Sequence, residues 1–311
     1  MEFAARRLGR FVVSCALLVT AAFGMIHAIP GDPVRASVGL TASPEVVEAQ
    51  RARFRLDEPI GEQYLHFVGG VLRGDLGDSI VQRRPVVEEI EALLPSTLKL
   101  AGLSFLVTIL VGIPTGVMIA VLSHHGRWRS AELAFSMGSG VATVIPQFLM
   151  GVGLVFVFGV TFDLLPIAGR SDASSYVLPV VALALGPTAL LARIVRVETH
   201  RVLDETYVLT ARAKRLPPAR IYLRHVLPNA LAATLTVAGS ILGALIAGTV
   251  LIEHVFAWPG LGTTLVQSIG GKDYAAVQGL ALVFGAAVLI INMVVDFALA
   301  VVDPRSTMVR S

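Results

Sequence analysis

Charged side chains are scarce in this 311-residue sequence, and their scarcity excludes most soluble folds. Asp, Glu, Lys and Arg make up only 15% of the residues, whereas 55% are hydrophobic. A soluble domain carries about a quarter charged residues. The formal net charge of +3 is too small to indicate a general affinity for nucleic acid. We therefore expect lipid to surround most of the chain.

Cysteine and the common enzyme motifs are also missing. Cys15 is the only cysteine, so the chain can form neither an internal disulfide nor a cysteine-based metal site, and we interpret it as a small buried hydrophobic residue. No Gly-x-x-x-x-Gly-Lys-Ser/Thr stretch is present to bind ATP, and neither His-Glu-x-x-His nor Gly-x-Ser-x-Gly occurs. We expect no catalytic residue, no metal site and no cofactor bound by this chain.

The sequence contains instead six long apolar windows. Crossing about 30 Å of hydrocarbon takes about 20 apolar residues in a helix. Six runs of that length or more lack Asp, Glu, Lys and Arg: 11–31, 100–123, 133–162, 173–192, 226–252 and 274–295. They predict an all-α integral membrane protein with six transmembrane helices, the last of them reaching residue 302. Pro146 and Gln147 interrupt the third window, which we keep as one kinked span, with two shorter helices as the alternative.

The first window imitates a secretory signal, because Arg6, Arg7 and Arg10 precede it. Its apolar stretch is longer than that of a signal, and no convincing small-x-small cleavage site comes before Pro30. We interpret it as a retained span that follows a short N-terminal segment, residues 1–10.

The distribution of Lys and Arg predicts how the chain crosses the membrane, because these side chains resist translocation. Fifteen of the 25 lie in four segments: 1–10, 124–132, 193–225 and 303–311. Segment 32–99 holds another eight, but the rule loses force for a segment of that length. The short connections 163–172 and 253–273 carry only Arg170 and Lys272. We therefore expect the four basic segments, and with them both termini, in the cytoplasm, and we expect these two connections and the long segment 32–99 outside.

Segment 32–99 is predicted to form short amphipathic helices. The start of one is indicated by an N-cap, a first-turn proline and an acid at Ser43, Pro44 and Glu45. Further on, apolar side chains recur at helical spacing: Ile60, Tyr64, Phe67, Val68, Val71 and Leu72. This stripe either caps the spans or provides a docking surface for an extracytoplasmic partner, and the sequence leaves both interpretations open.

Within the spans, small residues and polar pairs indicate helix packing. Gly112 with Gly116, and Gly239 with Gly243, lie four residues apart, a spacing that lets helices approach closely. Polar pairs at span ends are interpreted as structural: Glu253 with His254, and Asn292 with Asp296. No ionisable side chain lies in the middle of a window, where a proton- or sodium-coupled carrier usually has one. The energy for any transport is therefore expected to come from outside this chain.

The connection 193–225 is the longest of those expected inside. Helix-forming residues run to Leu216, Pro217 and Pro218 stop them, and a second short helix starts at Ala219. Two short helices joined by a sharp bend would form a compact knob that transmits a push from a soluble partner to the neighbouring spans. A basic helix lying on lipid headgroups is the alternative.

With this connection included, nearly the whole sequence resembles the permease subunits of ABC importers, specifically the first permease of the dipeptide and oligopeptide permease pair. The connection is similar to that family's EAA loop. Four further stretches match family patterns: Arg6-Arg7-Leu8 leading to Ile29-Pro30-Gly31-Asp32-Pro33, Leu72-Arg73-Gly74-Asp75-Leu76-Gly77, Phe256-Ala257-Trp258-Pro259-Gly260-Leu261-Gly262, and Val302-Asp303-Pro304-Arg305. The resemblance implies the type I ABC importer fold, that of the binding-protein-dependent permeases.

The resemblance also implies site residues. Seven residues of the EAA loop would couple the chain to a separate ATPase: Thr210, Ala211, Arg212, Ala213, Lys214, Arg215 and Leu216. The family has a glycine where this sequence has Arg215, and a glycine at such a bend usually supplies backbone freedom. We expect Pro217 and Pro218 to supply the bend instead. Trp258, Pro259 and Gly260 are candidates for the outer mouth or gate, with an interfacial aromatic anchor as the alternative for Trp258.

The function implied is ATP-driven solute import across the cytoplasmic membrane, first of di- and oligopeptides, with nickel complexes or haem as alternatives. The implied partners are a second homologous permease, two ABC ATPase subunits that bind ATP and Mg, and an extracytoplasmic solute-binding protein. A secondary carrier is less favoured, because no internal repeat is visible. A passive channel is the other rival, and it would conduct alone.

Overall fold

The computed structural model describes residues 2–28, 43–53, 57–79, 81–126 and 128–302. Over these residues the chain is helical and has no β-strand, only an isolated bridge between Asp78 and Pro85, which confirms the all-α prediction. The predicted tail 303–311 and the Pro-Gly turn at residues 29–33 lie outside the described residues.

Contacts divide the chain into two compact units. Unit 1 comprises Met1–Thr97 and Pro259–Leu289, and unit 2 comprises Leu98–Trp258 and Ile290–Ser311. The longer helices are α1 (Glu2–Ala28), α5 (Val86–Ser123), α6 (Arg129–Val144), α8 (Val177–Leu203), α11 (Leu227–Val255) and α13 (Tyr274–Val302). The shorter ones are α3 (Pro44–Arg53), α4 (Ile60–Arg73), α7 (Gln147–Leu154), α9 (Thr206–Ala213), α10 (Pro218–Ile221) and α12 (Leu261–Gly270).

Five described helices contain a stretch long and apolar enough to cross a membrane: Arg7–Met25, Val86–Ser123, Ser174–Leu203, Val237–Val255 and Tyr274–Val295. Each overlaps a predicted window, although most of the ends differ. The bent pair α6 and α7 raises the number to six if it forms one span.

The third predicted span, 133–162, is broken by a sharp bend. α6 and the helical segment Gln147–Thr161 meet at 101°, which is far more than a kink, so the chain follows the alternative of two shorter helices. Pro146 lacks an N–H and disfavours helical geometry in the residue before it, and Ile145 accordingly adopts an extended conformation with φ −69° and ψ 122°.

The bend rests on α8 and α11 through a polar contact. Pro187 inside α8 has no N–H to donate to the carbonyl of Leu183, four residues earlier. The side-chain amide of Gln147 donates to that carbonyl instead, at 3.4 Å. Gly248 of α11 leaves room for the amide, because a Cβ there would lie 2.5 Å from Gln147 Oε1. The break in one helix therefore satisfies a backbone group that the proline in another leaves free.

The core of unit 2 lies between α5, α8 and α11. Its buried members include Leu183, Leu191, Val195, Leu245 and Ile252. As the glycine spacing predicts, α5 approaches α8 closely: a Cβ on Gly116 would lie 2.5 Å from the carbonyl oxygen of Ala192, and one on Gly112 would lie 3.2 Å from that of Thr188. The two helices are in backbone contact, so any side chain there would push them apart.

In unit 1, α4 packs against α1, as the cap interpretation of the outer stripe expects. The ring of Phe23 lies 5.3 Å from that of Tyr64 and 5.8 Å from that of Phe67. The Tyr64 hydroxyl is 2.9 Å from Thr20 Oγ1. Leu72, by contrast, is 82% exposed. The stripe is thus partly used within the unit and partly open.

A buried carboxylate fixes the start of α13 in unit 1. Asp273 is fully buried, and its Oδ1 accepts the backbone N–H of Ala276 at 3.2 Å, which caps the helix. Its Oδ2 accepts the Ser79 hydroxyl at 2.5 Å and the N–H of Val81 at 3.0 Å. One side chain therefore joins the segment before α5 to the turn between α12 and α13.

Candidate functional site

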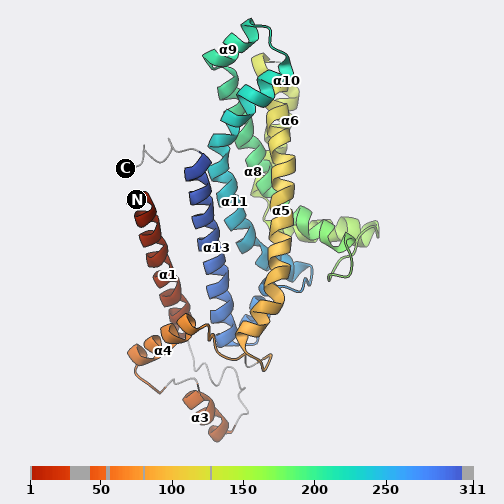
Figure 1. Ribbon diagram of the computed structural model, residues 1–311. Helices are drawn as coiled ribbons and strands as arrows, with labels where there is room; N and C mark the ends of the chain where they lie inside the picture. The colour runs from red at the N-terminus through yellow and green to blue at the C-terminus, as the bar shows by residue number, and fades with distance from the viewer. Residues whose placement is uncertain (1, 29–42, 54–56, 80, 127, 303–311) are drawn as a thin grey trace. The chain divides into compact units, whose positions relative to one another are not determined.

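The connection between α8 and α11 forms a compact knob, defined here as residues 204–226. α8 continues to Leu203, past the predicted span end at residue 192, and α9, α10 and a π-helical turn, Tyr222–Val226, follow. In Figure 1, α9 and α10 lie together at the end of α8 and α11. The prediction of two short helices is confirmed, with shifted ends: α9 stops at Ala213 and α10 starts at Pro218.

The knob has a hydrophobic core of its own, shared with the ends of α8 and α11. Its buried members are Val202, Leu203, Val208, Ala211, Ile221, Val226 and Ala230, and Leu216 and Tyr222 pack against them. Because the knob is packed rather than merely tethered, a force applied to α9 is transmitted to α8 and α11.

The bend after α9 has a defined geometry in which Arg215 takes the place of a glycine. Arg215 has φ 51°, the left-handed conformation that glycine adopts without strain. Its N–H bonds the carbonyl of Arg212 at 2.9 Å, and the N–H of Leu216 bonds that of Ala211 at 3.3 Å. These two bonds, with the Leu216–Ala211 contact, form a Schellman motif.

The expectation that prolines alone would supply this bend is therefore wrong. Arg215 makes the turn itself, at a cost of about 1–2 kcal/mol for a left-handed non-glycine residue. Pro217, with φ −55° and ψ 138°, then sets the entry to α10, and Pro218 occupies its first turn. The conformation matches what a glycine would give, so the substitution changes the side chain at the bend and not its shape.

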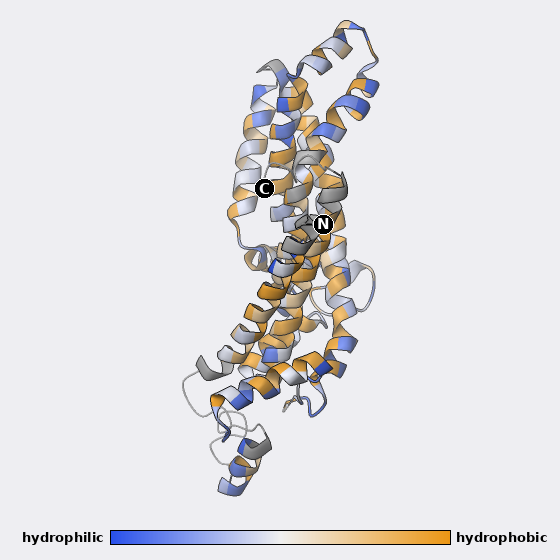
Figure 2. Ribbon diagram, turned by 60° about the vertical axis from the view of Figure 1, so that its left-hand side comes forward, coloured by the Kyte–Doolittle hydropathy of each residue, from blue (hydrophilic) through white to orange (hydrophobic). Residues whose placement is uncertain are grey.

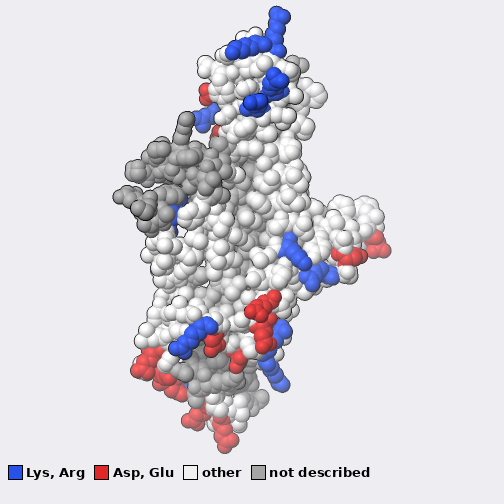
Figure 3. Space-filling model, viewed as in Figure 1, with Lys and Arg blue, Asp and Glu red and all other residues white. Residues whose placement is uncertain are grey.

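The coupling candidates divide into inward and outward residues. Ala211 is buried and Arg212 and Leu216 are half-buried, whereas Thr210, Ala213, Lys214 and Arg215 are exposed. The exposed residues lie at the tip, where Figure 3 shows Lys and Arg side chains gathered. Ala211 and Leu216 belong to the core of the knob, and the four exposed residues, with the charge of the half-buried Arg212, are available to a partner.

The surface of the knob combines positive charge with exposed apolar side chains. Five basic residues make no ion pair within the part of the chain that the structure describes: Arg212, Lys214, Arg215, Arg220 and Arg224. Tyr207 is 42% exposed, Leu209 50% and Leu223 67%, and Figure 2 shows hydrophilic and hydrophobic residues together on the knob. Unpaired charge beside exposed apolar area is typical of a protein interface.

Tyr207 on α9 has a raised pKa. Burial raises the pKa of its hydroxyl above the usual 10.0, and the neighbouring negative charge of Glu205 raises it further. The phenol is therefore neutral at physiological pH, and it contributes an apolar ring with a hydrogen-bonding tip.

The outer candidates lie where the chain passes from unit 2 to unit 1. Trp258, the last residue of unit 2 before Pro259, is fully buried, and its ring meets that of Tyr176 edge-on at 4.6 Å. In unit 1, Pro259 is exposed and Gly260, which precedes α12, is buried with an extended backbone. A fully buried indole contacts neither lipid nor solute in this conformation, so the interfacial-anchor alternative for Trp258 is wrong. That the three residues line the outer mouth stays a prediction.

Glu253 and His254, two adjacent polar residues near the end of α11, differ in burial, as expected for neighbouring positions on a helix. Glu253 is fully buried and His254 is exposed. Over the described residues, no group of three or more His, Cys, Asp or Glu side chains is arranged to hold a metal ion. The side chain of Asp296, predicted to pack with Asn292, lies outside the described part of the chain.

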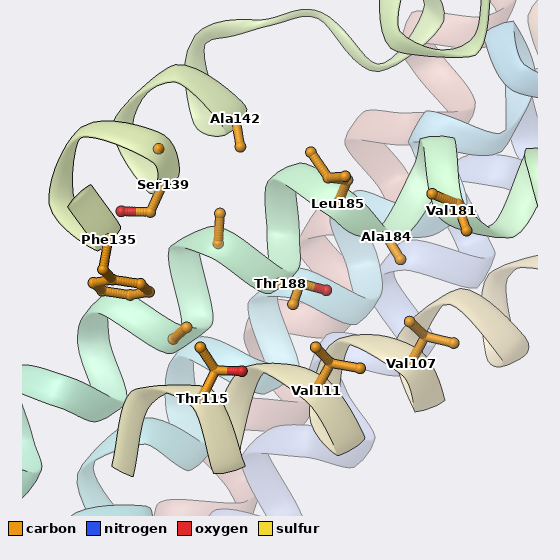
Figure 4. Close-up of a pocket in the computed structure, with 13 residues that line it drawn as sticks. Val107, Val111, Thr115, Phe135, Ser139, Ala142, Val181, Ala184, Leu185 and Thr188 are labelled. Atoms are coloured by element: carbon orange, nitrogen blue, oxygen red, sulfur yellow. The ribbon is translucent and has the colours of Figure 1, made fainter. Parts of the chain in front are cut away.

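Unit 2 contains a groove that was not predicted from the sequence. It has a volume of 460 Å³ and lies between α5, α6 and α8. Figure 4 shows Val107, Val111 and Thr115 on one side and Phe135, Ser139 and Ala142 on another, with four residues of α8 between them: Val181, Ala184, Leu185 and Thr188. Its walls are apolar apart from a few hydroxyls. Ordinary span residues dispersed over three helices carry no sequence signal, so only the fold reveals this groove.

The sequence matches one family over most of its length. The family described as "Binding-protein-dependent transport system inner membrane component" matches residues 112–308. The N-terminal part of such membrane components, described as "Binding-prot-dependent transport system membrane comp, N-term", matches residues 1–101.

Curated relatives and solved structures agree with this match. Glutathione transport system permease protein GsiC of Escherichia coli (strain K12) is 34% identical over 304 residues, which cover 98% of both chains. Probable D,D-dipeptide transport system permease protein DdpB of the same strain is 36% identical, with 91% of both chains covered. An inward-facing structure of the MetNI methionine ABC transporter matches at a TM-score of 0.59 and 19% identity, over 69% of this chain and 96% of that one. At that identity the structural match shows the fold alone.

Proposed function

Because this chain belongs to the family of binding-protein-dependent transport system inner membrane components, it is a permease subunit of an ABC importer, and we propose that its substrates are short peptides. The named activities of two relatives, glutathione transport and D,D-dipeptide transport, support this substrate class. Both solutes are short peptides. Nickel complexes and haem remain the alternatives within the same machinery.

The knob carries the proposal that ATP hydrolysis by separate subunits drives this chain. It is a packed, positively charged projection. Its exposed tip, Ala213 to Arg215, carries charge that no described residue pairs, and its core continues into two long apolar helices. A soluble ATPase that bound the tip would therefore move α8 and α11 directly. ATP and Mg would be bound by that partner.

The complete importer would contain four further components. We propose a second homologous permease, two ABC ATPase subunits at the knob, and an extracytoplasmic solute-binding protein that delivers the peptide. The exposed part of the α4 stripe, which includes Leu72, is the surface we assign to the binding protein.

The orientation follows from the same assignment. The knob lies in the cytoplasm, where the ATPases are, and so do both termini, because Lys and Arg are concentrated on the segments of that side. The outer segment that contains α3 and α4 then lies on the opposite face of the membrane.

Purification and transport test the proposal together. The chain, tagged and gently solubilised, should recover two ATPase chains and a second permease, and vesicles holding the complex should take up dipeptide or glutathione only with ATP. The double variant Arg212→Glu, Lys214→Glu should keep membrane insertion but lower uptake about tenfold or more, since reversed charges at an interface cost several kcal/mol. Arg129→Glu, an exposed basic residue at the start of α6 and outside the knob, is the matched control and should leave uptake unchanged.

Two results would contradict this account. Uptake by the purified chain alone would indicate a carrier or a channel. Normal uptake by the charge-reversed variant would show that the knob does not hold the motor.

A further inference from the structure

A polar cluster joins the end of α5 to the last turn of α8, directly before the knob. Ser123 is the last residue of α5, and His124 begins the short 3-10 helix that follows. His200 lies in the last turn of α8, and Asp204 ends that helix. These four residues, all in unit 2, are called here the histidine bridge.

The hydrogen bonds of Ser123 define how His200 takes part. The Ser123 hydroxyl donates to the carbonyl of Ile119 at 2.8 Å and lies 3.0 Å from His200 Nε2. A hydroxyl has one hydrogen, and that hydrogen is already used. His200 therefore donates its Nε2–H to Ser123, which fixes which ring nitrogen carries the proton.

His124 extends the bridge to the first residue of the knob. Its ring stacks on that of His200, with centroids 5.9 Å apart and planes 11° from parallel. His124 Nε2 lies 3.3 Å from Asp204 Oδ1. His200 and Asp204 are four residues apart, so they face the same side of α8. The end of α5 thus touches α8 at two successive turns.

The bridge provides a connection that the core of the knob lacks. The buried members of that core come from residues 202–230, which belong to α8, the knob and α11. α5 contributes Val107, Val111 and Thr115 to the groove. Its glycines contact the α8 backbone farther from the knob. A second helix, α6, is tied to α8 by the ion pair of Glu132 with Arg196, one turn before His200.

We propose that Ser123 and His200 are positioning residues for transport, because they carry displacement of the knob to α5 and thereby to the wall of the groove. This inference rests on the proposed function. Without the bridge, the ATPase still binds the knob and hydrolyses ATP, but the end of α5 no longer follows the last turn of α8, although the glycine contacts of α5 with α8 farther from the knob remain. The number of ATP molecules hydrolysed per solute should then rise.

Substitutions at His200 separate this role from a merely structural one. His200→Phe keeps an aromatic ring for stacking but cannot donate to Ser123, whereas His200→Gln loses the ring and keeps a donor. In the reconstituted complex we expect His200→Phe to raise the ATP-to-dipeptide ratio about three- to tenfold, the range in which residues of coupling networks act. His200→Gln should stay near the wild-type ratio.

Substitutions at Ser123 provide the control and the additivity test. Ser123→Ala should raise the ratio as His200→Phe does, and the double variant should be no worse than either single one, because both remove the same bond. Ser104→Ala is the matched control: Ser104 is a buried α5 serine that donates to Leu100, also four residues earlier. Its loss should leave the ratio unchanged.

The outcomes separate the positioning role of Ser123 and His200 from the proposed function. An unchanged ratio in both Ser123→Ala and His200→Phe, or an equal rise in Ser104→Ala, would overturn the positioning role while the importer assignment stands. A wild-type complex that neither hydrolyses ATP nor takes up dipeptide or glutathione would instead refute the proposed function.

Discussion

Two helix ends in unit 2 share one backbone motif and use it for opposite purposes. Two residues after the end of each helix the backbone is left-handed, at Arg215 after α9 with φ 51° and at Ala257 after α11 with φ 44°, and neither residue is glycine. In both, the next N–H reaches back to a carbonyl five residues earlier: Leu216 to Ala211 at 3.3 Å, and Trp258 to Glu253 at 2.8 Å.

The surroundings of the two motifs differ. After α9 the turn holds Lys214 and Arg215 outward, where their charges are unpaired. After α11 the turn drives Trp258 into the core, fully buried against Tyr176. The same geometry therefore accompanies exposed charge in one place and a buried aromatic ring in the other.

The largest effect is expected at the buried anchor. Trp258→Ala should lower the free energy of unfolding by about 3–5 kcal/mol, because it leaves a cavity in a packed core. Thermal unfolding in detergent measures it. Trp128→Ala is the control, since Trp128 is 62% exposed and should change stability by less than about 0.5 kcal/mol. Equal losses for the two tryptophans would remove the contrast between anchor and surface.

At the knob, the residue after the turn should matter less. Leu216→Ala removes a half-buried side chain and should cost about 1–2 kcal/mol, less than a fully buried leucine. The measurement is hydrogen exchange of the α9 amides, which should accelerate while those of the α11 end do not. Equal acceleration at both ends would mean that the knob has no stability of its own.

Replacing either left-handed residue by glycine should raise the stability slightly. Arg215→Gly and Ala257→Gly each relieve about 1–2 kcal/mol of backbone strain but add up to about 1 kcal/mol of unfolded-chain entropy. The net gain should be below about 1 kcal/mol, seen as a slightly higher Tm. Arg215→Gly should also weaken ATPase binding slightly, because a charge is lost, while Ala257→Gly leaves binding unchanged. A destabilising Arg215→Gly would show that the arginine side chain holds the turn.

The smallest effect is a pH dependence confined to the knob. The pKa of Tyr207 is raised by burial and by Glu205, so the folded state keeps the phenol protonated longer than the unfolded chain does. Stability is therefore full below pH 10.0 and falls as pH rises through the higher folded pKa. The Tm should drop slightly more between about pH 9 and pH 11 in the wild type than in Tyr207→Phe. Identical profiles would show that Tyr207 is solvated.

The spans were predictable because hydrocarbon thickness imposes one length on all of them. Their ends were not. α5 begins at Val86, before the charge-free window, because Glu88 and Glu89 lie in its first turn, where the helix dipole accommodates acids. α8 continues to Leu203 because its last turns pack in the core of the knob. The size of the bend at Pro146 depends on Gln147 and Gly248, a tertiary contact that no local rule contains.

The two short helices of the knob were predictable, and the turn between them was not. The pattern from Thr210 to Leu216 marks the knob, but a left-handed arginine runs against residue preference, so the turn could not be placed at Arg215. Trp258 was expected at a surface because Trp is frequent at membrane interfaces, and only packing with Tyr176 shows it buried. The groove and the histidine bridge join residues far apart in sequence, which a single sequence does not bring together.

Crosslinking from the tip of the knob shows directly whether an ATPase subunit binds there. A photo-reactive residue at position 213, which is exposed, would be placed in the complex that performs ATP-dependent uptake. We expect a crosslink to an ATPase subunit. This crosslink should be absent when the photo-reactive group is moved to Leu72 on α4. A crosslink to lipid alone, in a complex that still transports with ATP, would contradict the assignment of the knob as the site where the motor acts.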